Sequence, residues 1–175
     1  MMKYNDEIID FFKSHNLYDK EMFDYLESKT DMVDYQMEED RAFIGCGYSV
    51  DRKTKRLVNF RICIPYCYDD KTTLISIHEL AHGIWAYKHL NKKFKEIEVE
   101  LFPMLLERIY LMENTSTALT SYTAYLDSTI DDEADEKYRF ALSNRDILLK
   151  ENYSDFSSID RRTKKLVRKW CKAKR

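Results

Sequence analysis

Apolar residues recur at helical spacing near the start of the chain, in two groups separated by a polar break around residues 14–16. The first group is Ile8, Ile9, Phe11 and Phe12, and the second is Met22, Phe23, Tyr25 and Leu26. A period near 3.6 residues is typical of helices that bury one face, so the pattern predicts two successive helices within residues 4–28. Residues 31–41 are acidic, and their pattern is compatible with either a helix or a loop.

The pattern changes to that of strands after residue 41. Residues 42–50 combine two glycines with small or β-favouring residues, and residues 57–66 (LVNFRICIPY) are rich in β-branched and aromatic side chains. The charged segment 51–56 separates them. This arrangement predicts two strands joined by a charged turn, as an antiparallel hairpin or a sheet edge.

Helical spacing returns at residue 72 and continues towards the end of the chain. We expect helices near residues 72–90, 95–113, 132–150 and 158–172, with a further segment around 115–128. The whole pattern predicts a mainly helical α+β fold with a small sheet that contains an antiparallel pair. A chain of 175 residues is long enough for one core and short for two, so we expect residues 1–175 to form a single domain.

Composition excludes several functional classes. The three glycines leave no material for a glycine-rich phosphate loop. The formal net charge of −2 gives no overall attraction to nucleic acid or to a membrane, and the basic segment 161–175 is interpreted as a solvated helix end. No apolar run is long enough to span a membrane. The acidic N-terminus differs from a signal peptide and the four cysteines from a zinc-binding pattern, so we expect free thiols and a cytoplasmic location.

The candidate chemistry lies in the sequence HELAH at residues 78–82. On a helix, His78 and His82 are one turn apart and project from the same face, as two nitrogen ligands of a tetrahedral zinc ion require. Glu79 is rotated by about 100° from His78, which places it beside the metal as a general base for zinc-activated water. Small residues at positions 81 and 83 leave room for a substrate or a strand. His89 is too far along the helix to reach the same ion and is interpreted as a packing or surface histidine.

A third ligand has to come from elsewhere, and the next predicted helix offers Glu98, Glu100 and Glu107. Glu100 and Glu107 are seven residues apart and share a helix face with apolar residues, where an acid is costly unless it is paired or binds a metal. We expect Glu100 to be the ligand and Glu107 to accept the free N–H of a ligating histidine. Glu98 and Glu107 remain alternative ligands. Tyr122, Tyr125 and Tyr138 are candidates to stabilise the oxyanion of a tetrahedral intermediate.

The residues His78-Glu-Leu-Ala-His82 followed by Val99-Glu100 and Glu107 resemble the thimet oligopeptidase and oligoendopeptidase F family of zinc peptidases. That resemblance implies that Glu100 is the third zinc ligand and Glu107 the outer acid. The chain departs from the family in having Ala81 where the family has glycine, and by spacing alone Glu107 fits the ligand position better. A second resemblance is to the compact ImmA/IrrE-type peptidases, whose pattern would make Glu98 the ligand.

Both resemblances imply a zincin-like metallopeptidase domain of the gluzincin kind, with a helix that carries the histidines and a helix that carries the glutamate. We therefore expect a zinc-dependent peptidase that acts on a peptide or protein substrate, with no membrane partner and with nucleic acid an unlikely one. The alternative is a catalytically inactive zincin-like module that binds a protein or peptide partner. A Glu79→Gln variant discriminates between the two, because only the enzyme would lose an activity.

Overall fold

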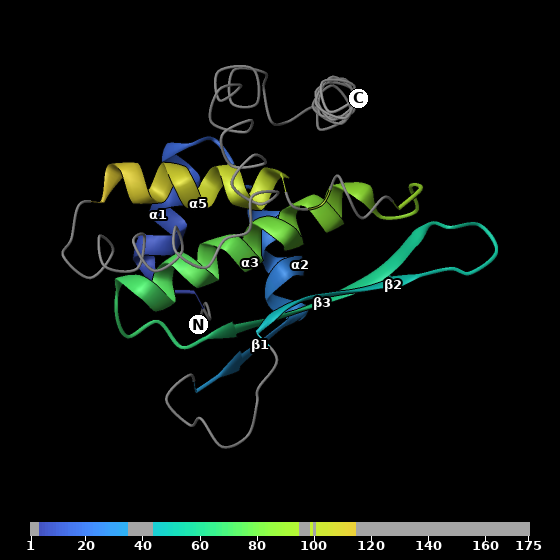
Figure 1. Cartoon of the computed structure of the whole chain (residues 1–175), viewed down its shortest axis with the longest axis horizontal. Helices are drawn as coiled ribbons and strands as arrows, with labels where there is room; N and C mark the ends of the chain where they lie inside the picture. The colour runs from blue at the N-terminus through green and yellow to red at the C-terminus, as the bar shows by residue number, and fades with distance from the viewer. Residues whose placement is uncertain (1–3, 35–43, 95–98, 100, 115–175) are drawn as a thin grey trace, which may run out of the picture.

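The computed structural model describes residues 4–34, 44–94, 99 and 101–114 (Figure 1). The elements in chain order are α1 (Asp6–Ser14), α2 (Lys20–Ser28), β1 (Thr30–Val33), β2 (Gly45–Val50), β3 (Leu57–Pro65), α3 (Asp70–His89) and α5 (Leu101–Glu113). The described part of the chain is thus a small, mainly helical α+β fold, as the sequence predicts, and its sheet is mixed and three-stranded. The helices expected beyond residue 114 lie outside the described residues. Within the described residues, no helix combines the length and apolarity needed to cross a membrane.

The two N-terminal helices are separated at the expected break, and each begins at a capping side chain. Asn5 accepts a hydrogen bond from the Ile8 backbone N–H at 2.9 Å, and Asp19 accepts one from the Met22 N–H at 2.8 Å. These caps satisfy backbone donors that lack a partner in the first turn of a helix. The apolar groups identified from the sequence form the buried faces of α1 and α2.

The sheet has the strand order β1-β3-β2. The predicted hairpin is confirmed, because β2 and β3 pair antiparallel on either side of the charged turn. β1 pairs parallel with β3, with Thr30 opposite Ile62. The undecided acidic segment therefore begins with a short strand, and its remainder from residue 35 lies outside the described residues. β3 buries Phe60, Ile62 and Ile64 on the face that packs against the helices.

α3 is the central element of the fold and lies between the sheet and α5 (Figure 1). It begins with a capping box formed by Asp69 and Thr72. Its close approach to the sheet depends on Gly83, where an added Cβ would lie 2.3 Å from Cδ1 of Ile62 and 3.2 Å from Cδ2 of Leu26. The room that the small residue leaves is therefore filled by a strand and a helix of the core.

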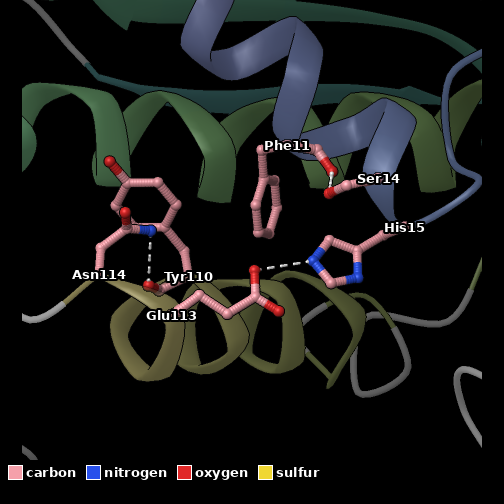
Figure 2. A network of polar contacts seen from close by, with 6 residues as sticks. All are labelled: Phe11, Ser14, His15, Tyr110, Glu113 and Asn114. Carbon is pink, nitrogen blue, oxygen red and sulfur yellow. Dashed lines mark hydrogen bonds and ion pairs between the residues drawn. The ribbon is translucent and has the colours of Figure 1, made fainter.

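α5 is fixed against α1 at its C-terminal end (Figure 2). His15 Nε2 lies 3.0 Å from Glu113 Oε2, and the ring of Phe11 packs edge-on against that of Tyr110 with centroids 5.5 Å apart. The Tyr110 hydroxyl also donates a hydrogen bond to the Glu7 carboxylate. These contacts hold α5 in place along α3, and so fix the position from which Glu107 reaches the histidines.

Candidate metal centre

The two histidines of the motif lie one turn apart on α3 with their rings facing each other. Their Nε2 atoms are 3.2 Å apart, and the ring centroids are 4.9 Å apart. His82 is 5% exposed, whereas His78 is half-buried. Both Nε2 atoms therefore point to a common location, as the spacing in the sequence predicts for side chains on one helix face.

α5 supplies the partner of the outer nitrogen of His78. Glu107 Oε2 lies 3.0 Å from His78 Nδ1, and Glu107 is 5% exposed. A carboxylate in this position accepts the Nδ1–H, which directs the Nε2 lone pair inwards and makes the ring a better ligand. The hydrogen bond also explains how an acid can be buried on an otherwise apolar helix face.

The sheet supplies the partner of the outer nitrogen of His82, which was not predicted from the sequence. The Tyr48 hydroxyl on β2 lies 2.9 Å from His82 Nδ1. Its ring packs against Phe94, with centroids 5.2 Å apart, and against Trp85, with centroids 6.4 Å apart. Tyr48 is therefore held from both sides, and its hydroxyl fixes the orientation of the His82 ring. The alternation of β2 would have placed Tyr48 on the helix side of the sheet, but only tertiary structure pairs it with His82.

Burial keeps His82 neutral. Removal from water, together with a smaller contribution from the neighbouring His78, lowers the pKa of His82 from 6.5 to about 2. When the Nδ1–H of a neutral imidazole donates the hydrogen bond, here to the Tyr48 hydroxyl oxygen, the lone pair is on Nε2, which is the form that binds metal ions. The lowered pKa of His82 and the orientation of its ring therefore both favour binding of a metal ion through Nε2.

The arrangement fits a tetrahedral zinc ion. Two nitrogens bound at about 2.0–2.1 Å in tetrahedral geometry are roughly 3.3–3.4 Å apart, and the two Nε2 atoms are 3.2 Å apart. Among the described residues, no group of three or more His, Cys, Asp or Glu side chains could hold a metal ion. The expected third ligand, Glu100, and its alternative Glu98 lie outside the described residues, as do Tyr122, Tyr125 and Tyr138.

Glu79 is half-buried on α3, and its negative charge affects the pKa of two thiols in the sheet. Burial raises the pKa of Cys46 to about 12; a hydrogen bond with Tyr48 opposes this shift, and the charge of Glu79 adds to it. Burial also raises the pKa of Cys63, and Glu79 again contributes. The charge of Glu79 therefore opposes ionisation of these two thiols, whereas the carboxylate of Glu107 is bonded to His78. Cys46, Cys63 and Cys67 are free thiols and are half-buried.

His89 belongs to the core and not to the site. Its ring stacks on Trp85, with centroids 4.0 Å apart and planes 11° apart, and its Nδ1 lies 2.7 Å from the Trp85 carbonyl oxygen. The expectation of a packing histidine is confirmed.

Comparison of the chain with protein-family models, with curated proteins and with solved structures finds no significant match. The chemical interpretation therefore depends on the geometry of the two histidines and their partners.

Proposed function

We propose that this protein is a zinc-dependent peptidase. The observation that carries the proposal is the pair of Nε2 atoms 3.2 Å apart, each on a ring whose Nδ1 has a hydrogen-bond partner, the buried Glu107 for His78 and the half-buried Tyr48 for His82. Two imidazoles arranged in this way can supply two of the four ligands of a tetrahedral zinc ion. We assign the third ligand to Glu100, in the segment before α5, with Glu98 as the alternative; Glu107 is engaged with His78 as the outer acid.

Zinc, when bound, would supply Lewis-acid activation of water and of a substrate carbonyl group. A side chain of the protein would transfer the proton. Glu79 follows His78 directly in α3 and is rotated by about 100° from it on the helix. We therefore assign its carboxylate the role of taking a proton from the attacking water and passing it to the leaving amine. Glu107 has a different role, because its Oε2 lies 3.0 Å from His78 Nδ1 and orients that ring.

The sheet offers a place for an extended substrate beside the histidines. In the described residues β2 pairs only with β3, so its outer edge presents backbone N–H and C=O groups. An extended peptide can add to such an edge as a further strand. Tyr48 links this strand to His82, so a peptide on β2 would pass close to the two histidines. A helix bearing both histidines and a general base, an edge strand beside it and a glutamate-bearing helix together support a zincin-like domain of the gluzincin kind.

Two measurements test the proposal. The purified protein is expected to contain about one zinc ion per chain and to cleave unstructured peptides. The Glu79→Gln variant is expected to keep the zinc and to lose at least about a hundredfold in kcat/KM, because general-base catalysis contributes roughly 10²–10⁴-fold. Glu21→Gln, on the exposed side of α2, is the matched control and is expected to leave both zinc content and cleavage unchanged.

The outcomes separate an enzyme from a binding module. A protein that lacks zinc after purification and fails to bind it on titration contradicts the proposal at its base. A protein that binds zinc but cleaves no peptide, or whose cleavage is unaffected by Glu79→Gln, would instead be a module that uses the same surface to hold a partner.

A further inference from the structure

Six basic side chains gather at the end of the β2–β3 hairpin. They are Arg52, Lys53, Lys55, Arg56, Lys92 and Lys93, and we refer to them as the basic tip. All six are exposed. Four belong to the turn between the strands and two to the segment after α3, so the cluster is created by folding and is not a single charged run.

Backbone hydrogen bonds hold the two segments of the basic tip together. The Leu57 N–H donates to the Lys92 carbonyl at 3.0 Å, and the Phe94 N–H donates to the Lys55 carbonyl at 2.8 Å. Arg56 and Lys93 form an isolated antiparallel bridge. Lys55 is in the left-handed region at φ 57, a conformation that costs free energy for a side chain with a Cβ. The basic side chains are therefore displayed on an ordered backbone, at some energetic cost.

The charge of the basic tip is not balanced locally. Asp51 is the acid beside it, and its Oδ1 accepts hydrogen bonds from the Lys53 and Thr54 backbone N–H groups at 3.1 and 2.6 Å. Within residues 4–34, 44–94, 99 and 101–114, none of the six cations forms an ion pair with a carboxylate. The chain as a whole has a formal net charge of −2, so this local excess is a property of one surface. Such a surface attracts anionic groups.

The basic tip continues the strand that contacts the candidate metal centre. Tyr48 touches His82, β2 ends at Val50, and Arg52 follows two residues later. Four residues of extended chain span about 13 Å. In Figure 1 the hairpin extends from the sheet beyond the C-terminal end of α3. A peptide lying along the outer edge of β2 would thus reach Arg52 and Lys53 of the basic tip about four to six residues from the bond beside His82. Lys92 and Lys93 lie on the other side of β3, where their segment is bonded to Leu57.

We propose that the basic tip binds acidic side chains of the substrate, and that the peptidase prefers peptides with Asp or Glu about four to six residues to one side of the cleaved bond. This inference rests on the proposed function, because it uses the same strand edge. A nucleic acid fits the surface less well: single-stranded nucleic acid is bound with aromatic stacking, and the exposed tyrosines 66 and 68 lie at the opposite end of β3. A membrane also fits less well, because Val58 is the one large exposed apolar side chain of the described residues next to the basic tip.

The test is a binding experiment that does not depend on catalysis. The full-length Glu79→Gln protein is titrated against two fluorescein-labelled peptides of equal length, which differ only in carrying three Glu or three Gln at one end. The same titrations use a tip variant (R52Q/K53Q/K92Q/K93Q) and a control in which four cations elsewhere, three exposed and one half-buried, are replaced (K13Q/K20Q/K29Q/R61Q). Both variants remove four charges, and neither removes a backbone hydrogen-bonding group. Thermal unfolding shows whether each variant is folded.

We expect the Glu peptide to bind about tenfold more tightly than the Gln peptide at low salt, and to lose this advantage in the tip variant but not in the control. Raising the salt concentration should remove it as well, because exposed charges are screened. Equal binding of the two peptides, or an unchanged preference in a folded tip variant, would overturn the inference. So would tighter, tip-dependent binding of a single-stranded oligonucleotide or of phosphatidylserine vesicles.

Failure of this inference can be distinguished from failure of the proposed function. The anisotropy titration reads peptide binding alone, whereas zinc content and cleavage by the unmodified protein read the metal centre. An active zinc peptidase that ignores the acidic residues contradicts only the role of the basic tip. A protein without zinc that still prefers the Glu peptide contradicts only the peptidase.

Discussion

The two sides of α3 hold the two histidines by different chemistry. On the α5 side, a buried carboxylate, Glu107, lies 3.0 Å from His78 Nδ1. On the sheet side, a neutral phenol, Tyr48, lies 2.9 Å from His82 Nδ1. Hydrogen bonds to an ionised group are roughly twice as strong as those between neutral groups. The α5 side therefore holds its imidazole more strongly, and the sheet side depends more on packing.

Burial follows the same division. His82 is 5% exposed and lies in the layer between α3 and the sheet, where Gly83 allows the closest approach. His78 is half-buried beside α5. Its charged partner compensates for a looser environment, whereas His82 is kept neutral by the exclusion of water. The comparison shows that two histidines of one motif can be prepared for the same metal ion by a charge on one side and by burial on the other.

Of the changes to the two histidine partners, neutralising the carboxylate on the α5 side should weaken zinc binding the most. Glu107→Gln keeps the size of the side chain and can still accept a hydrogen bond from His78, but it loses the negative charge. We expect the affinity for zinc to fall by about ten- to a hundredfold, the usual range for removing an outer-shell partner. Competition with a chromophoric chelator measures this. Glu113→Gln, on the same helix but paired with His15, is the control. Equal affinities for Glu107→Gln and the unmodified protein would show that the charge is unimportant.

The burial of His82 predicts how the stability of the metal-free protein depends on pH. The pKa of His82 is lowered to about 2 in the folded state, against about 6.5 in an unfolded chain. Below about pH 6.5 the unfolded chain therefore binds one more proton at this residue than the folded protein does. The free energy of unfolding should fall as the pH falls, by up to about 1.4 kcal/mol per pH unit, or about 2 kcal/mol between pH 7 and pH 5.

Urea unfolding of the metal-free protein at these two pH values measures the effect. His82→Asn removes the titrating group and should flatten the dependence, whereas His15→Asn, on the surface between α1 and α5, should leave it in place. If the His82→Asn variant loses as much stability on acidification as the unmodified protein, burial of His82 is not its cause.

The comparison also shows which parts of the structure the sequence could predict. The helices α1, α2 and α3 and the β2–β3 hairpin follow from hydrophobic periods that act within about twenty residues. β1 did not follow, because it has only four residues, one of them the exposed Asp31, and its parallel pairing with β3 depends on tertiary structure. A strand of this length has too little pattern to be distinguished from a loop.

The same distinction applies to the candidate site. His78, Glu79 and His82 form a local motif, because helix geometry alone places them relative to one another. Glu107 could be suggested as an outer acid, since an acid within an apolar helix face needs a partner. Tyr48 could not, because it is 34 residues away from His82 and only the packing of the sheet on α3 brings them together. Contacts between elements that are distant in sequence leave no periodic signal.

The smallest expected effect concerns Tyr48, and it tests whether the sheet side holds His82 by hydrogen bonding or by packing alone. Tyr48→Phe retains the ring that packs against Phe94 and Trp85 and removes only the hydroxyl. The buried Nδ1 of His82 then loses its partner, and we expect the affinity for zinc to fall about fivefold, which corresponds to a net hydrogen-bond contribution of about 1 kcal/mol. Tyr4→Phe is the matched control, because it removes a buried hydroxyl that is bonded to Thr30 at 2.8 Å.

In NMR spectra of the zinc-loaded protein, the Nδ1 proton of His82 should be protected from exchange, and it should exchange faster in Tyr48→Phe. Unchanged exchange and unchanged affinity would mean that the rings of Trp85 and Phe94 suffice to orient His82, and the sheet side would then differ from the α5 side even more than the structure suggests.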